Sequence, residues 1–299
     1  MACSFEVTLS SDDAHHVPAA RVALDGVDAI EDQLTIFRDS SAISEINRRA
    51  AAGPISVDPA VFSLLRRCLE IYRDTGGAFD ITSTPLSRCW GFLLRAGRLP
   101  SSEVIAEARM RVGLDAVLLD EARGTVRFAR EGIELNLGAI GKGDALDRVA
   151  VGVRAAHVPH ALLSAGRSSL LALGGQHNGW SIDLVSPLAE RPLARVWLRD
   201  AALGTSGAGE QFVTVDGVRY GHVIDPRTGW PASGTISATA IASTAAAADA
   251  LSTAFLVDGV ALARNYCATH PGVMAIITPE AHRGPTIIGS FPGVRVEAS

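Results

Sequence analysis

The stretch TISATAIASTAAAADALSTAFLV, at residues 235–257, decides the fold because it runs from a β-strand directly into an apolar helix. Its first part, residues 235–243, contains the β-branched residues and the apolar character of a strand. Its second part, residues 243–257, is rich in alanine and predicts a helix. Because neither part leaves an obviously polar face, we expect a sheet that is covered by helices.

A single charged side chain, Asp249, lies in this apolar helix. Burial of a carboxylate costs several kcal/mol unless the group is paired or bound to a metal. Thr253 follows four residues later and therefore lies on the same helical face. Oxygen ligands at this spacing suit a hard cation such as Mg²⁺, which also accepts phosphate oxygens. The alternative is that Asp249 lies near the start of the helix and caps a neighbouring loop.

The rest of the chain alternates helical and extended segments and predicts an α+β fold. We expect helices over residues 22–34, from Asp58–Pro59 to the glycines at 76 and 77, over 102–110 and over 144–156. Strands are predicted at 125–129, 133–137, 161–165, 180–185, 212–215, 235–243 and 273–278. Since no linker or repeat interrupts this pattern, we predict one domain over residues 1–299.

The composition excludes several classes of protein. The chain has 299 residues and a formal net charge of −5, with no block of Lys and Arg, so binding to nucleic acid is not expected. The chain contains no run of 18 apolar residues, so no transmembrane helix is predicted. The first sixteen residues lack the features of a signal peptide, and the four cysteines are scattered without a zinc or disulfide pattern. We therefore expect a cytoplasmic protein, although removal of a leader is an alternative; the oligomeric state is left open.

A second informative segment is LNLGAIGKGDALD, at residues 135–147. It reads as a strand, a glycine-rich turn and a helix, a combination that presents backbone N–H groups to anions. Lys142 adds a positive charge where a phosphate would bind. By itself the segment is a weak phosphate-site signal, and the alternative for Lys142 is an ordinary exposed lysine.

Two further segments suggest binding and catalysis. In GHVIDPRTGWP, at 221–231, His222 lies near Asp225, Arg227 and Thr228 around a turn, and a histidine is the natural general base at neutral pH. A structural histidine is the alternative. In GGAFDIT, at 76–82, a phenylalanine and an aspartate after two glycines suit an aromatic ring with one polar edge. The alternative there is a helix end followed by a strand.

Taken in order, these segments resemble the FAD:protein FMN transferase family, the ApbE-like proteins, over nearly the whole chain. The matching blocks are FRDSSAISEIN (37–47), TGGAFDIT (75–82) with PLSRCWGF (85–92), LGAIGKG (137–143), GTSG (204–207), HVIDPRTGWP (222–231) and DALSTA (249–254). One block would be weak support, whereas six in the expected order are specific.

The resemblance implies transfer of the FMN half of FAD to a Ser or Thr hydroxyl of an acceptor protein, with release of AMP and a requirement for Mg²⁺. It implies metal ligation by Asp249, Thr253 and the backbone carbonyl of Ala139, and His222 as the base. It implies FAD contacts from Phe37, Ala78, Phe79, Asp80, Asn136 and Lys142. The alternatives are an Mg²⁺-dependent FAD pyrophosphatase and a flavin-binding carrier without turnover.

The sequence departs from the family pattern at several positions. Asn136 replaces the usual Asp before Leu-Gly-Ala, and Phe37 stands where a tyrosine is common. SAGRSS, at 164–169, replaces Ala-Gly-Gly-Asp and exchanges an acid for Arg167 and hydroxyl groups. These changes leave the expected metal ligands and base in place and alter the expected flavin contacts.

Overall fold

The computed structural model describes residues 3–176, 178–187, 192–209, 211–280 and 284–298. The chain forms two compact units. Unit 1 comprises Met1–Ile30, Ile140–Gly207 and Gly234–Ser299, and unit 2 comprises Glu31–Ala139 and Ala208–Ser233. Whether the two act as one catalytic domain stays a prediction.

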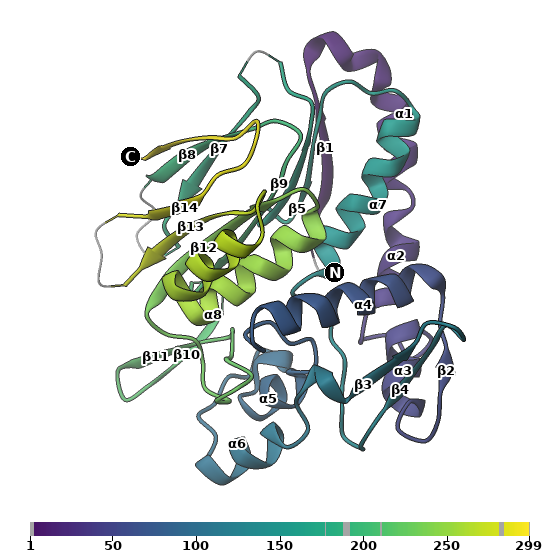
Figure 1. Ribbon diagram of the computed structural model, residues 1–299, viewed down its shortest axis with the longest axis vertical. Helices are drawn as coiled ribbons and strands as arrows, with labels where there is room; N and C mark the ends of the chain where they lie inside the picture. The colour runs from purple at the N-terminus through teal and green to yellow at the C-terminus, as the bar shows by residue number, and fades with distance from the viewer. Residues whose placement is uncertain (1–2, 177, 188–191, 210, 281–283, 299) are drawn as a thin grey trace. The chain divides into compact units, whose positions relative to one another are not determined.

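Unit 1 is built on a seven-stranded sheet (Figure 1), with strand order β1-β5-β6-β9-β12-β13-β14. The strands are β1 (Phe5–Leu9), β5 (Ala161–Ala165), β6 (Ser169–Leu173), β9 (Ala202–Gly207), β12 (Thr235–Ala242), β13 (Met274–Pro279) and β14 (Thr286–Gly289). All neighbouring pairs run antiparallel. The expected α+β fold with a sheet covered by helices is thereby confirmed.

Strand β6 explains why several strands read as continuous apolar runs. All five of its residues are buried. Leu171 packs into a core with helices α7 (Gly141–Ala155) and α8 (Ala245–Thr269) on one face of the sheet. Leu170 packs into a second core on the other face, against a three-stranded sheet. That sheet contains β7 (Trp180–Val185), β8 (Pro192–Leu198) and β15 (Arg295–Ala298). Both faces are covered, so the polar alternation of a half-exposed strand is absent.

Helix α8 is long and apolar enough to span a membrane by length and composition alone. Of its most apolar 18-residue window, 61% is buried inside the protein, as expected for a core helix. The helix is interrupted at Gly259, where φ is 66°. The remaining helical elements of unit 1 are η1 (Ser11–His16) and α1 (Val17–Leu24).

Unit 2 contains shorter elements around its own core. Its helices are α3 (Ala42–Arg49), α4 (Pro59–Asp74), α5 (Thr84–Cys89), η2 (Phe92–Leu94), α6 (Ser102–Arg109) and η3 (Leu114–Ala116). β2 (Ile55–Ser56), β4 (Thr125–Phe128) and β3 (Val117–Asp120) form one sheet, and β10 (Phe212–Val215) pairs with β11 (Val218–Gly221). Helix α2 (Val27–Leu34) spans the division between the units.

Helix α4 begins and ends where the sequence predicts. The Asp58 side chain accepts a hydrogen bond from the backbone N–H of Ala60, and Pro59 occupies the first turn. Val61, Leu64, Leu65, Cys68 and Ile71 form its buried face. The segment after the helix is a turn rather than the strand that the alternative for GGAFDIT required.

Three other expectations need correction. The predicted helix 22–34 is two helices, α1 and α2, separated at Asp25 and Gly26. Helix α7 begins at Gly141, so the predicted glycine turn is itself the first helical turn. Residues 133–137 do not form a strand. Their backbone pairs instead with a side chain: Asn47 donates to Leu135 O and accepts from Leu135 N.

Candidate functional site

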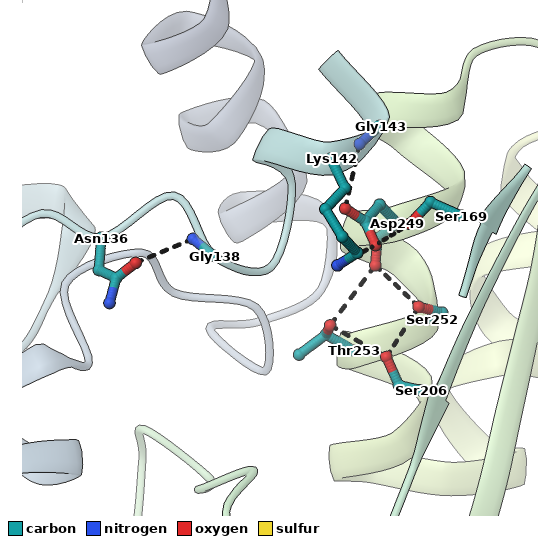
Figure 2. A network of polar contacts seen from close by, with 9 residues as sticks. All are labelled: Asn136, Gly138, Lys142, Gly143, Ser169, Ser206, Asp249, Ser252 and Thr253. Carbon is teal, nitrogen blue, oxygen red and sulfur yellow. Dashed lines mark hydrogen bonds and ion pairs between the residues drawn. The ribbon is translucent and has the colours of Figure 1, made fainter. Parts of the chain in front are cut away.

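Asp249 is 3% exposed and is the buried carboxylate that the sequence predicts. Its Oδ1 accepts a hydrogen bond from Ser169 Oγ at 2.9 Å and lies 3.3 Å from Lys142 Nζ. Its Oδ2 accepts a hydrogen bond from the backbone N–H of Gly143 at 3.2 Å. These contacts, shown in Figure 2, join α7, α8 and the start of β6. Asp249 therefore accepts from the first turn of helix α7, rather than from a loop as its alternative interpretation had it, and also pairs with a cation.

The close approach of α7 and α8 places these groups together. A Cβ atom on Gly143 would lie 2.1 Å from the backbone oxygen of Ala245, so only glycine fits there. Asp147 of α7 accepts hydrogen bonds from Ala245 N and Ala246 N, at 2.8 and 3.0 Å. The carboxylate of one helix thus satisfies free N–H groups at the start of the other.

Three further hydroxyl groups form a connected set that reaches the backbone oxygen of Asp249 (Figure 2). Ser252 Oγ and Thr253 Oγ1 both donate to the backbone oxygen of Asp249, at 2.8 and 3.4 Å. Ser206 Oγ of β9 contacts these two hydroxyls at 2.9 and 3.2 Å. Gly204 permits this packing, since a Cβ there would lie 2.4 Å from Ala248 O. The expected same-face position of Asp249 and Thr253 is present.

The donor chemistry of this cluster fits a magnesium ion. A carboxylate and two hydroxyl oxygens, from Asp249, Thr253 and Ser206, are hard oxygen ligands. Within the described residues, no three His, Cys, Asp or Glu side chains gather as a metal site. A magnesium ion here would therefore depend on one carboxylate, on hydroxyl oxygens and on oxygens of the substrate.

The segment before α7 is held by its own side chain. Asn136 Oδ1 accepts a hydrogen bond from Gly138 N at 2.9 Å (Figure 2), and Asn136 N donates to Ile81 O at 2.8 Å. The amide therefore closes a turn that the carboxylate usual in the family would also close. Ala139 directly precedes Ile140, the N-cap of α7. Metal ligation by the Ala139 carbonyl stays a prediction.

The expected flavin contacts of unit 2 differ in exposure. Phe37 is 74% exposed and offers a ring surface to a ligand. Ala78 and Phe79 are each 1% exposed, so their side chains belong to the core. The ring of Phe79 is therefore not a stacking surface in this conformation. The exposed fraction includes the backbone, so neither residue presents a surface to FAD in this conformation, and their contact with FAD stays a prediction.

Asp80 is buried and lines a pocket of about 490 Å³ inside unit 2. Tyr72, Asp115, Arg109, Arg130 and Arg227 also line this pocket. Burial raises the pKa of Asp80 to about 6, although hydrogen bonds from Thr82 and Leu114 N oppose the shift. The volume is typical of a small-molecule site.

His222 follows β11 and is half-buried. Its Nδ1 lies 3.2 Å from the carbonyl oxygen of Gln211. Because a carbonyl only accepts, Nδ1 is the donor in this contact, and the neutral form of the ring then has its lone pair on Nε2. The polar neighbours expected for His222 pair elsewhere: Asp225 forms a two-oxygen ion pair with Arg227, at 2.9 Å for each bond.

The sequence did not single out Ser169 or Ser206 as individual residues. Both occur in blocks that the resemblance used, SAGRSS and GTSG. Neither serine was predicted to lie in a strand, so the hydroxyl residues within the two blocks were the available signal. Asp249, the partner of Ser169, lies 80 residues away from it, and Ser252, a partner of Ser206, lies 46 residues away, so local spacing did not reveal the contacts.

Comparison with known proteins gives consistent results. The FAD:protein FMN transferase of Treponema pallidum is 33% identical over 306 residues, covering 94% of this chain and 81% of that protein. The crystal structure of the ApbE protein of Thermotoga maritima aligns with a TM-score of 0.86 at 30% identity, covering 96% of this chain and 94% of the other. The apo flavinyl transferase ApbE of Pseudomonas stutzeri has a TM-score of 0.79 at 27% identity, covering 95% and 93%.

The family match has the same extent. Residues 1–277 match the ApbE family, which includes nearly all of the elements described above. The match contains Lys142, Ser169, Ser206, Asp249 and Thr253. The chain belongs to the ApbE family.

Proposed function

We propose that this protein transfers the FMN moiety of FAD to a Ser or Thr hydroxyl of an acceptor protein, in a reaction that requires Mg²⁺ and releases AMP. The family membership and the relatives named flavin transferases support the transfer. The observation that carries the metal requirement is the buried Asp249, with Thr253, Ser206 and Lys142 around it.

In this proposal, Asp249 and Thr253 hold the metal together with the Ala139 carbonyl. Bound Mg²⁺ supplies positive charge that neutralises the pyrophosphate of FAD. Lys142 and the N-terminus of α7 add further positive potential toward phosphate oxygens. Ser169 and Gly143 N orient the Asp249 carboxylate through their hydrogen bonds.

His222 is proposed as the general base. With its proton on Nδ1, the ring holds a lone pair on Nε2 that accepts the proton of the acceptor hydroxyl. The acceptor oxygen then forms a bond to the FMN phosphorus. The bond from that phosphorus to the bridging oxygen breaks, and AMP leaves with that oxygen. Atoms and charge balance when His222 releases its proton to solvent.

The proposed contacts with FAD are Phe37, Ala78, Phe79, Asp80, Asn136 and Lys142. Phe37 has an exposed ring for stacking, and Asp80 lines the 490 Å³ pocket. The assignment of these residues to FAD rests on the family resemblance.

The test is incubation of the protein with FAD, MgCl₂ and a candidate acceptor protein. We expect a protein-linked flavin, visible as a fluorescent band after denaturing electrophoresis, together with stoichiometric AMP. Free FMN with AMP would identify a pyrophosphatase, and unchanged FAD would identify a carrier. Asp249→Ala is expected to abolish the metal-dependent activity; wild-type turnover in this variant would overturn the metal assignment.

A further inference from the structure

Lys142 is the only lysine in the sequence; all other members of the 27 Lys and Arg residues are arginines. It is the second residue of α7, and its Nζ lies 3.3 Å from Asp249 Oδ1. The Asp249 side chain is 4% exposed, and the Lys142 side chain is 22% exposed. The one ammonium group of the chain's side chains therefore pairs with the carboxylate that is proposed to bind the metal.

We propose that Lys142 is an internal counterion of Asp249 that is displaced by the metal and then pairs with the pyrophosphate of FAD, which couples the binding of metal to the binding of FAD. This inference rests on the proposed function. It differs from a fixed phosphate contact, because it gives Lys142 two alternative partners.

The hydrogen-bond inventory of Asp249 supports an exchange of cations. A carboxylate has about four acceptor positions, and Lys142, Ser169 and Gly143 N take three of them. A metal ion on this carboxylate would lie close to the ammonium group, and two cations in a poorly solvated site repel. Ser169 and Gly143 N are neutral donors, so they can stay in place and orient the carboxylate when Lys142 leaves.

The presence of lysine rather than arginine at position 142 also favours an exchange of partners. An arginine here would engage the carboxylate through a rigid two-bond fork, as Arg227 does with Asp225. Lysine presents a compact charge on a flexible stem, which suits a group that changes partner. Other acidic residues in the first two turns of α7 have partners of their own: Asp144 pairs with Arg148 at 2.7 Å, and Asp147 caps α8.

The exchange has a thermodynamic consequence. Removal of the Lys142 charge should strengthen metal binding in the absence of FAD, since the competing cation is gone. The same change should weaken FAD binding to the metal-loaded protein, since a phosphate partner is lost. By thermodynamic linkage, the metal and FAD each raise the affinity of the protein for the other by the same factor. We expect this coupling factor to be smaller in a variant that lacks the Lys142 charge. A fixed phosphate ligand would show only the loss of FAD affinity.

The experiment measures Mn²⁺ affinity by electron paramagnetic resonance for FAD-free wild type, Lys142→Met, Asp249→Asn and the control Arg154→Met, which removes an exposed charge from the last turn of α7. Relative to wild type, we expect Mn²⁺ to bind about tenfold more tightly to Lys142→Met, with unchanged affinity to the control Arg154→Met, and not to bind to Asp249→Asn. FAD affinity at saturating Mn²⁺ should fall about tenfold in Lys142→Met.

Two outcomes separate this inference from the proposed function. Metal binding that needs Asp249 and is equal or weaker in Lys142→Met overturns the exchange and leaves the proposed function intact. An absence of metal binding in the FAD-free wild type overturns the exchange alone, because the proposed function allows the metal to enter with FAD. Metal binding that is equal in wild type and Asp249→Asn overturns both.

A measurement on the wild-type protein avoids dependence on the folding of a variant. Reductive methylation with ¹³C-formaldehyde labels the single lysine and the α-amine, so Lys142 gives one assignable NMR signal. We expect this signal to shift on saturation with Mg²⁺ and to shift again, to a different position, on addition of FAD. A signal that does not move at metal saturation overturns the exchange.

Discussion

Replacement of Gly143 by alanine tests whether close contact between α7 and α8 holds the site together. The new Cβ would lie 2.1 Å from Ala245 O, 2.4 Å from Ala245 C and 2.6 Å from Ala246 N. All three are backbone atoms, so no side chain can rotate away. Cβ contacts shorter than 3.0 Å essentially never occur, so the two helices must separate by about 0.9 Å, from 2.1 to 3.0 Å.

The separation has a calculable cost. Overpacking of a core contact costs about 1–3 kcal/mol. The hydrogen bond from Gly143 N to Asp249 Oδ2, at 3.2 Å, would be lost, at about 1.5–3 kcal/mol for a charged acceptor. Better helix propensity of alanine returns about 1 kcal/mol. We expect Gly143→Ala to lower the free energy of unfolding by about 1.5–5 kcal/mol.

Urea unfolding followed by far-UV circular dichroism measures this change at constant m-value. Gly26→Ala is the matched control in unit 1, because its Cβ would have Ala23 O at 3.8 Å as its nearest contact. We expect the control to change stability by less than about 1 kcal/mol. Equal stability of Gly143→Ala and wild type would refute the argument from helix contact.

Other positions give further tests. Ser169→Ala should lower Mn²⁺ affinity several-fold and stability by about 1–3 kcal/mol, since it removes a buried donor to Asp249; unchanged Mn²⁺ titrations would remove Ser169 from the site. His222→Ala should slow transfer at least about 10²-fold with FAD affinity retained, and a collapse of FAD affinity in fluorescence titrations would contradict its role as base. For Asp80, burial raises the pKa from 3.8 to about 6, so the folded state binds the proton more tightly. Its contribution to stability is present below about pH 4 and is lost as the pH rises through 6, so the unfolding free energy of wild type relative to Asp80→Asn should fall by about 2–3 kcal/mol between pH 4 and 7; a constant difference would contradict this pKa. Trp90→Phe should cost about 2–4 kcal/mol in urea unfolding, because Trp90 is fully buried and donates to Gly229 O at 2.9 Å, and a loss below 1 kcal/mol would show that the contact is dispensable.

Local signals in the sequence predicted the elements with clear boundaries. Helix α4 has a capping aspartate, a proline and an amphipathic face, and it forms as expected. Strands β5, β7 and β10 match their predicted ranges residue for residue. Strand β9 was not predicted, because its sequence ALGTSG is rich in small residues that usually mark a loop. Gly204 is needed there for a long-range reason: helix α8 packs directly on its backbone.

Residues 133–137 were predicted to be a strand and do not form one, the reverse of the case of β9. The alternation of buried and partly exposed residues over 133–137 is that of a strand, so the pattern was correctly identified. The hydrogen bonds of Leu135 nevertheless go to Asn47, 88 residues away. Alternation reports burial and does not report the hydrogen-bond partner, which can be a side chain.

Local sequence patterns also failed to identify the long-range partners in the candidate site. Helical periodicity was enough to place Asp249 and Thr253 on one face of α8. It could not reveal that Lys142, Ser169 and Ser206 surround them, because those residues come from α7, β6 and β9. Only the resemblance to the family linked these segments before the structure did.

The division of unit 1 into three chain segments has a consequence for synthesis on the ribosome. Strand β9 pairs with β6 on one side and with β12 on the other, and β12 is followed by α8, β13 and β14. The central sheet therefore stays open on one side until residues after 234 have left the exit tunnel, and the nascent chain carries an unpaired edge for that time. All of unit 2 is translated before that point. Vectorial synthesis thus delivers a complete unit 2 before the sheet that packs against α8, the helix of Asp249, can close.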